Sequence, residues 1–331
     1  MDYLMFGRKQ KKARVEETAT RATLSDAWQE KLQQVDWMAA PGMADYVNGL
    51  VSGKPLVHGG HWAIYALNHH LLPLANRDQS GQHGGRLSML SLACGSAHIE
   101  QALISNFHWP IESLLGLEYD EALRAAATES FAAIDNCRSE FKFFDFNAKN
   151  VAEEKYDLVY CCHSIHHAEN LEQLLPFIND SMKDDGLFVG IDYFGPTRFQ
   201  IEHDVLPIIE ELFSVLPEEL RVDLRSNEPR VEHQFETGTI KEVRELDPSE
   251  SVRSSDLRTL LFSNFEVVEI KPMGGTLLRW LLQYRAGNFD VGNANHTCIA
   301  RLLQIIEREL IASRRIRSDD LFFVLKKSKR L

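Results

Sequence analysis

Short apolar runs alternate with helical patterns through the middle of the chain. Five runs have the length and composition of strands that are buried on both faces of a sheet. They span residues 86–92, 113–118, 141–144, 156–162 and 186–193. Residues 121–133 and 171–182, between these runs, place apolar side chains at helical spacing. Strands that alternate with helices predict right-handed crossovers, and therefore a doubly wound parallel sheet of the α/β class.

Further helical patterns lie on both sides of this alternation. Residues 24–51 predict two helices that break near Pro41, and residues 61–72 predict a third. The polar stretch at 217–229 predicts a turn or a short helix. Beyond the fifth run the patterns predict four more helices, at 201–216, 254–261, 277–284 and 297–312, and two more strands, at 265–271 and 321–325.

We divide the chain into four parts on this basis. They are an N-terminal helical cap (1–80), a ligand-binding core (81–200), an inserted substrate lid (201–263) and the C-terminal part of the core, with an expanded helical hairpin (264–331). The minimal sheet does not need the insertion, so we expect the insertion to determine substrate choice.

A turn of small residues follows the first strand: Ala93, Cys94, Gly95, Ser96 and Ala97. Small side chains let the backbone bend sharply and approach a ligand, and the free N–H groups of the next helix favour polar or anionic groups. The turn therefore predicts a nucleotide-like ligand. A plain strand-to-helix turn without a ligand is the alternative, because such turns also collect small residues.

Polar side chains stand at the ends of the later strands, where parallel sheets bind ligands. Glu118 follows the turn at the distance at which nucleotide-binding α/β folds place a ribose-binding carboxylate. His163, His166 and His167 follow the fourth strand, and a neutral imidazole is a competent general base. Arg198, beyond the fifth strand, is a candidate either to bind a substrate carboxylate or phosphate or to tether the insertion.

Several segments together resemble the class I S-adenosylmethionine-dependent methyltransferases that act on small molecules, of the type 11/12-like kind. They are LSLACGSAHIE, GLEYDEALRAAA, FFDFNA, KYDLVYCCHSIHHAENLEQLL and SMKDDGLFVGIDYFGP. The resemblance covers residues 86–198 well and 265–327 more loosely. It implies a Rossmann-like sheet of seven strands, in which the last strand lies antiparallel between the fifth and the sixth.

The resemblance also implies S-adenosylmethionine as the cofactor and assigns residues to it. The backbone of Ala93, Cys94, Gly95 and Ser96 would hold the methionine part, Glu118 the ribose, and Asp145 with Phe146 the adenine. Tyr119, Cys162 and His163 complete the expected cofactor-binding set. The chain departs from the family at three positions: Ser91 replaces an acid, and Ala93 and Ala97 replace glycines. We therefore expect no cofactor contact through Ser91, while alanine still permits most of the turn.

Methyl transfer from a sulfonium is an in-line displacement, which requires alignment of the reacting atoms and removal of a proton from a hydroxyl acceptor. The candidates for catalysis are His163, His166 and Tyr193, and those for substrate binding are Tyr193, Arg198 and Trp62. We expect no metal, and a hydroxyl or amine of a small organic molecule, such as a natural product, as the acceptor. Two alternatives stay open. One is a SAM-binding protein that transfers no methyl group, and the other is an NAD-dependent oxidoreductase, although the turn lacks GxGxxG.

Composition narrows the set of partners. The 331 residues carry a net charge of −12, which argues against binding to nucleic acid or to an anionic membrane. Five cysteines, two of them adjacent in a predicted buried strand, indicate reduced thiols and a cytoplasmic protein. No apolar run reaches the about eighteen residues of a membrane span. The apolar stripe at 302–310 predicts a helix packed on the core, with a contact in a homodimer as the alternative.

Overall fold

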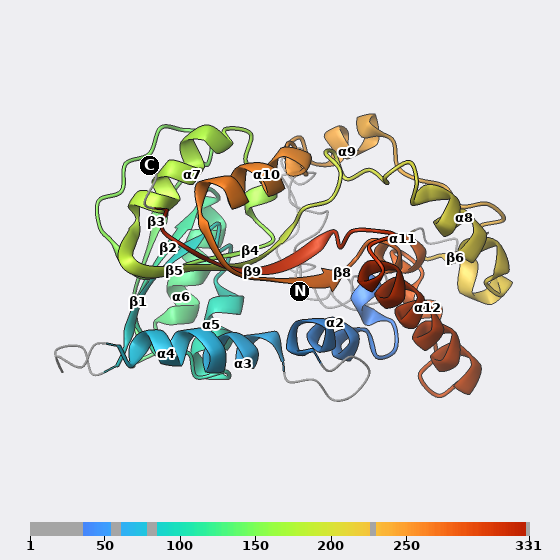
Figure 1. Cartoon of the computed structure of the whole chain (residues 1–331), viewed down its shortest axis with the longest axis horizontal. Helices are drawn as coiled ribbons and strands as arrows, with labels where there is room; N and C mark the ends of the chain where they lie inside the picture. Colours follow the sequence, from blue (N-terminus) through green and yellow to red (C-terminus); the bar gives the residue numbers. More distant parts are fainter. Residues whose placement is uncertain (1–35, 54–60, 78–84, 226–229, 329–331) are drawn as a thin grey trace, which may run out of the picture.

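The computed structural model describes residues 36–53, 61–77, 85–225 and 230–328. Most of the first helix predicted at 24–51 lies outside these ranges. Within them, a seven-stranded sheet forms the centre of the molecule (Figure 1). None of the helices in the described part of the chain is long and apolar enough to cross a membrane.

The sheet has the strand order β3-β2-β1-β4-β5-β9-β8. Its strands are β1 (Leu87–Leu92), β2 (Ile111–Glu118), β3 (Arg138–Phe143), β4 (Tyr156–Cys162), β5 (Met182–Tyr193), β8 (Glu266–Gly274) and β9 (Asp320–Lys326). The strands β1 to β5 pair in parallel, whereas β9 runs antiparallel between β5 and β8. The predicted fold class, with its antiparallel last strand, is therefore confirmed.

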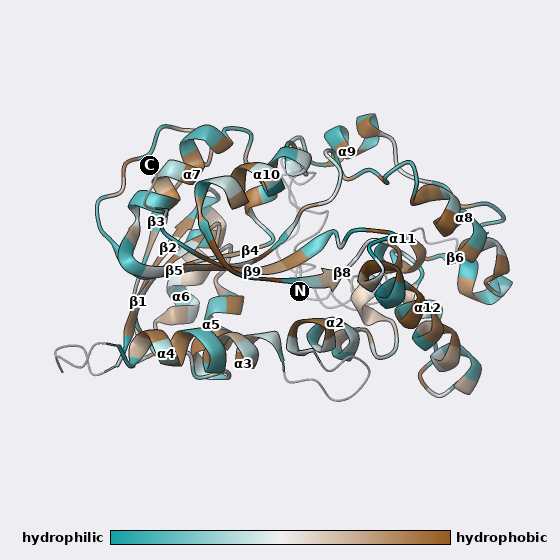
Figure 2. Cartoon of the chain, viewed as in Figure 1, coloured by the Kyte–Doolittle hydropathy of each residue, from teal (hydrophilic) through white to brown (hydrophobic). Residues whose placement is uncertain are grey.

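Helices cover both faces of the sheet, which explains why its central strands are apolar throughout. Along β1, Met89 belongs to the core on one face and Leu90 to the core on the other, because successive side chains of a strand point to opposite faces. Figure 2 shows the apolar residues gathered on the sheet and on the helix sides that face it. The helices of the first face are α2 (Met43–Ser52), α3 (Trp62–Ala66), α4 (Leu72–Ala75), α5 (His98–Ser105) and α6 (Glu121–Phe131), and those of the second are α7 (Leu171–Asp180) and α10 (Ser254–Asn264).

Most of the insertion lies beyond the β8 edge of the sheet, at the opposite end from β3 (Figure 1). It contains α8 (Leu206–Val215), β6 (Val222–Asp223), β7 (Arg230–Val231) and α9 (Ile240–Leu246), and it returns to the sheet through α10. Within the stretch 217–229, Glu218–Arg221 form a short 3-10 helix, which confirms the short helix predicted there. The strands β6 and β7 pair antiparallel and were not predicted, because strands of two residues are too short to show a periodic pattern.

Two further helices, α11 (Leu278–Leu282) and α12 (Ala294–Ala312), expand the connection between β8 and β9, as predicted. The apolar residues of α12 differ in burial. Leu303 is buried in the core, whereas Leu302 is 53% exposed.

Glu307 of α12 holds this connection to the cap. Its buried carboxylate accepts hydrogen bonds from the hydroxyl of Tyr46 (3.0 Å) and from the backbone N–H groups of Gly275 (3.2 Å), Leu277 (2.7 Å) and Leu278 (3.0 Å).

We expect Glu307→Ala to lower the free energy of unfolding by about 4 kcal/mol, because it leaves several buried donors without an acceptor. Urea denaturation measures the change. Glu307→Gln, which keeps one acceptor oxygen, should lose less, and a loss below about 1 kcal/mol in the alanine variant would contradict this role.

Candidate functional site

A pocket of about 340 Å³ opens at the carboxyl ends of β1, β2 and β4. This volume lies within the range of small-molecule sites. Seven of the residues that the sequence singled out line it: Ala93, Glu118, Tyr119, Asp145, Phe146, His163 and His167. They come from four separate segments, and they meet because parallel strands end at the same edge of a sheet.

The turn after β1 bends through three residues in the left-handed region. Ala93, Gly95 and Ala97 have φ values of 48°, 58° and 56°. The two alanines therefore keep the conformation that the expected glycines would adopt, at a cost of about 1–2 kcal/mol each. Cys94 is buried behind the turn, and the Oγ of Ser96 lies 3.3 Å from the Nδ1 of His98.

Glu118 connects the turn to the end of β2. Its Oε2 accepts from the N–H of Gly95 (2.9 Å), and its Oε1 accepts from the N–H of Asp120 (2.8 Å). A carboxylate offers about four acceptor positions, so these two bonds fix its orientation and leave acceptor capacity on both oxygens. The carboxylate also lines the pocket. Its geometry therefore suits a ligand that presents two hydroxyl donors.

The carboxylate that is missing at position 91 comes instead from helix α5. The Oγ of Ser91 donates to the Oε1 of Glu100 at 2.5 Å, and both side chains are buried. The other oxygen of Glu100, Oε2, has no hydrogen-bond partner among the described residues. Burial raises the pKa of Glu100 to about 7. Our sequence reasoning missed this residue, although an acid in the first turn of the helix after a cofactor loop was a readable signal.

His163 lies on the wall of the pocket at the end of β4, in a constrained position. Its φ is 48°, and its backbone N–H donates to the carbonyl of Ile191 at 2.7 Å. The Nδ1 of its ring is enclosed and has no partner among the described residues. Burial lowers the pKa of His163, so the imidazole is neutral near pH 7. A neutral imidazole on the wall of a ligand pocket can accept a proton at its unprotonated nitrogen.

His166 has a different environment, because it is enclosed behind the pocket wall. Its Nδ1 lies 2.6 Å from the Oδ1 of Asp192, and its Nε2 lies 3.6 Å from the Oε1 of Glu250. The Oδ2 of Asp192 accepts from the backbone N–H groups of Ser164 and Ile165, both at 2.9 Å. Although burial alone would lower the pKa of His166, the carboxylate of Asp192 raises it. The ion pair therefore orients the loop that carries His163.

His166, His167 and Glu250 also place ligand atoms within 4.8 Å of one another, a spacing that a metal ion requires. Within this group, the Nδ1 of His166 is paired with Asp192 at 2.6 Å, and the Nδ1 of His167, which lines the pocket, lies 3.1 Å from the Oγ of Ser249. The expectation of no metal at this site stays a prediction.

The other predicted substrate and catalytic residues do not line this pocket. The hydroxyl of Tyr193 is buried and donates to the carbonyl of Pro196 at 3.3 Å, and burial raises its pKa well above the usual value. Arg198 donates from its Nη1 to the carbonyl of Pro248 at 2.6 Å, and its backbone N–H donates to the carbonyl of Ser251. Of the two roles considered for Arg198, the structure shows the tether.

Trp62 and Cys162 also lie outside the pocket lining. Trp62 packs edge-on against Trp109, with ring centroids 6.1 Å apart, and its ring centroid lies 6.4 Å from that of Phe322. Cys162 is only partly buried at the end of β4, and burial raises its pKa to about 12. Both residues pack against the hydrophobic core of the sheet.

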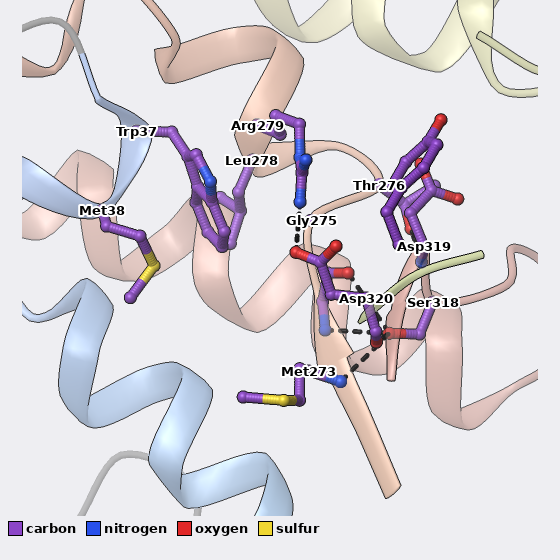
Figure 3. Close-up of polar contacts among 12 residues, drawn as sticks. Trp37, Met38, Met273, Gly275, Thr276, Leu278, Arg279, Ser318, Asp319 and Asp320 are labelled. Carbon is purple, nitrogen blue, oxygen red and sulfur yellow. Dashed lines mark hydrogen bonds and ion pairs between the residues drawn. The ribbon is translucent and has the colours of Figure 1, made fainter. Parts of the chain in front are cut away.

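Three charged residues that our sequence reasoning missed lie close to His163. The guanidinium of Arg279, in α11, donates to the Oδ2 of Asp320 at the start of β9 (Figure 3). Both groups are near enough to His163 to influence its pKa, and Asp36 also lies near Arg279 and His163. The sequence offered two signals for these charged residues. One is a lone arginine in the apolar sequence LRWLL, and the other is the acidic pair Asp319-Asp320 at the last strand.

Comparison with known proteins identifies the domain that contains this pocket. Residues 90–188 match the model of a family described as a methyltransferase domain. The chain carries a class I methyltransferase domain. S-adenosylmethionine is the cofactor of this class, as the sequence predicted. A search of curated proteins finds no match for the chain.

Solved structures of low sequence identity also align with this chain. One is an S-adenosylmethionine-dependent methyltransferase from Mesorhizobium loti, with 14% identity, a TM-score of 0.40, and coverage of 80% of this chain and 96% of that one. Another is an O-methyltransferase of a Brevibacillus brevis multienzyme in complex with S-adenosylhomocysteine, with 16% identity, a TM-score of 0.38, and coverage of 83% and 82%. A third is a Haloferax volcanii methyltransferase bound to its activator, with 14% identity, a TM-score of 0.42, and coverage of 92% and 96%. The family model, and not these TM-scores, identifies the domain.

The pocket of the methyltransferase domain fits its cofactor at the residues that the structure describes. The carboxylate of Glu118 keeps acceptor capacity for two ribose hydroxyls, and Asp145 and Phe146 line the wall beside it. The left-handed turn at Ala93 brings the backbone to the pocket without a bulky side chain. The Oε2 of Glu100, which lies behind the turn and outside the pocket lining, has no donor among the residues that the structure describes. An ammonium group, such as that of the methionine part, is a suitable donor for it.

We expect Glu100→Gln to weaken binding of S-adenosylhomocysteine about tenfold or more, because the variant loses a charge-assisted hydrogen bond. Methylthioadenosine, which lacks the amino-acid part, should bind the variant and the wild type alike. Isothermal calorimetry with both ligands measures the two affinities. An equal loss for both ligands would instead indicate that Glu100 only supports the turn.

Proposed function

We propose that the chain transfers a methyl group from S-adenosylmethionine to a hydroxyl group of a small organic molecule, with His163 as the general base. The observation that carries the proposal is the state of His163. Its imidazole is neutral, its enclosed Nδ1 has no hydrogen-bond partner among the described residues, and the residue lies on the wall of the candidate cofactor pocket. A nucleophilic hydroxyl must lose a proton during transfer, and a neutral imidazole at the reacting end of the pocket can take it.

The cofactor supplies an electrophilic methyl group on a sulfonium when it is bound. The chain's own residues then contribute mostly position. Glu118 would hold the ribose, the turn at Ala93 to Ala97 would hold the methionine part, and His163 would receive the proton of the acceptor. The backbone strain at His163, with φ at 48°, is maintained by its hydrogen bond to Ile191 and by the loop that Asp192 orients.

A hydroxyl acceptor agrees better with this site than an amine does. An uncharged amine attacks through its lone pair and releases its proton after transfer, so a base contributes less to the step. A hydroxyl is a weak nucleophile until its proton begins to leave, and the base therefore contributes directly to the barrier. The neutral, unpaired imidazole of His163 is what the hydroxyl reaction requires.

The test has two stages. Calorimetric titration with S-adenosylmethionine and S-adenosylhomocysteine establishes cofactor binding, for which we expect micromolar affinity, with NAD as a control that does not bind. A panel of small phenols, alcohols and amines is then incubated with protein and S-adenosylmethionine, and formation of S-adenosylhomocysteine is followed. Turnover of hydroxyl compounds supports the proposal. Cofactor binding with turnover of amines alone, or of no compound, contradicts it.

A further inference from the structure

A second pocket lies between the insertion and helix α11. It has a volume of about 420 Å³, and the segment 235–246 forms much of its wall together with residues of and after α11. Its apolar lining includes Phe199, Phe235, Val243 and Trp280. A cavity of about 150 Å³ is enough to bind benzene, so the pocket has room for a substituted aromatic compound.

Arg279 lines this pocket and is only 1% exposed. Its Nη2 donates to Asp320, and its guanidinium lies 5.8, 5.3 and 5.2 Å from the ring centroids of Trp37, Tyr193 and Phe199. Figure 3 shows the ring of Trp37 beside the guanidinium and Asp320 below it. The remaining nitrogens, Nε and Nη1, are buried and have no hydrogen-bond partner among the described residues. A buried guanidinium normally engages all its N–H groups, so these donors indicate a missing acceptor.

The other two arginines of the pocket lining differ from Arg279 in this respect. Arg285 donates from Nε and Nη2 to Glu232 and from Nη1 to the carbonyls of Trp280 and Gln283. Arg225 donates to Asp223 and stacks on the ring of Tyr284, 4.7 Å from its centroid. Arg279 is therefore the lining arginine whose enclosed donors stay unpaired within the described ranges.

Asp320 is the acidic partner of Arg279, and its Oδ2 accepts from one of the three guanidinium nitrogens, Nη2. The Oδ1 of Asp320 has no hydrogen-bond partner among the described residues. Burial raises the pKa of Asp319 well above its usual value, which favours the uncharged acid, and burial also raises the pKa of Asp36. A ligand with acceptor oxygens and one negative charge would complement the free nitrogens.

We propose that Arg279 binds a carboxylate of the methyl acceptor, so that the substrate is a small hydroxy acid whose body lies in the 420 Å³ pocket and whose hydroxyl reaches His163. This inference rests on the proposed function, because it identifies the acceptor of that reaction. A carboxylate suits the site better than a phosphate. It carries one negative charge, and a single guanidinium complements one negative charge better than the two charges of a phosphate. Arg279 thus takes the anion-binding role that the sequence had suggested for Arg198.

The test compares acids with their uncharged amides. Wild-type protein is titrated with 2-, 3- and 4-hydroxybenzoate and with the three matching hydroxybenzamides, with and without saturating S-adenosylhomocysteine. Binding is followed by the fluorescence of the tryptophans, since Trp280 lines the pocket and Trp37 lies beside Arg279. We expect at least one acid to bind tenfold or more tightly than its amide. In Arg279→Gln this preference should disappear, while the affinity for S-adenosylhomocysteine stays within threefold.

Two further variants make the result specific to Arg279. Arg285→Gln removes an equally buried arginine whose nitrogens are already paired, and it should keep the preference for acids. Arg279→Lys keeps the positive charge and should keep part of the preference for acids. This variant tests the inference if Arg279→Gln does not fold. Equal binding of acids and amides by the wild type, no binding of any acid at millimolar concentration, or an unchanged preference in Arg279→Gln would overturn the inference. Absence of S-adenosylhomocysteine binding would instead refute the proposed function. The two failures can be told apart, because the titrations without S-adenosylhomocysteine still measure the preference for acids that depends on Arg279.

Discussion

Glu118→Ala is expected to lower the affinity for S-adenosylhomocysteine by two to three orders of magnitude. The variant removes the carboxylate that would accept from the two ribose hydroxyls, and hydrogen bonds to a charged group contribute about 1.5–3 kcal/mol each. It also releases the N–H groups of Gly95 and Asp120, so the turn loses its connection to the end of β2. Isothermal calorimetry with S-adenosylmethionine and S-adenosylhomocysteine measures the loss.

Two variants serve as controls for this prediction. Glu118→Gln keeps the shape of the side chain and one acceptor oxygen, so it should bind more weakly than the wild type and more tightly than Glu118→Ala. Glu140→Ala removes an exposed carboxylate from β3 and should leave the affinity unchanged. Unaltered binding in Glu118→Ala would show that the carboxylate does not contact the cofactor and would place the ribose elsewhere.

His163→Gln is expected to slow methyl transfer by about 10²- to 10⁴-fold, which is the usual contribution of a positioned general base. The affinity for S-adenosylhomocysteine should change by less than about threefold, since glutamine retains a polar side chain of similar size and removes only the titrating nitrogen. Single-turnover rates with a hydroxy acceptor from the substrate screen, together with calorimetry, separate the two effects. A variant with the wild-type rate would remove His163 from the mechanism.

The dependence of the rate on pH provides a second readout for His163. Burial lowers its pKa from the ordinary histidine value of 6.5, so the proton-accepting form persists as the pH falls through that value. We expect a rate that is constant from pH 7.5 to about 6.5 and that falls only at lower pH, as the imidazole becomes protonated. This fall should disappear in His163→Gln and persist in His203→Gln, which alters an exposed histidine. A fall that begins above pH 7 would contradict a lowered pKa.

Local pattern predicted the parallel strands of the fold, and the family resemblance added the antiparallel last strand and several residues of the pocket wall. The alternation of apolar runs and helical patterns predicted the parallel strands, because periodicity along the chain reflects which faces are buried. Residues at strand ends, such as Glu118 and Asp145, met in one pocket because parallel topology alone brings those ends together. The small-residue turn identified the ligand class for a similarly local reason, since backbone geometry and helix N–H groups are properties of adjacent residues.

What only the tertiary structure decided is how side chains distant in sequence pair. Glu100 takes over the carboxylate that Ser91 lacks, Arg198 ties down the insertion, and Arg279 pairs with Asp320 from 41 residues away. Each of these depends on how helices and loops pack on the sheet, and no periodic pattern encodes that packing. The sequence by itself thus determined an α/β methyltransferase domain and the edge at which its cofactor pocket lies. Only the tertiary structure shows that, among the described residues, His163 has an unpaired ring nitrogen and Arg279 has unpaired donors. Both properties follow from burial and from contacts between separate elements.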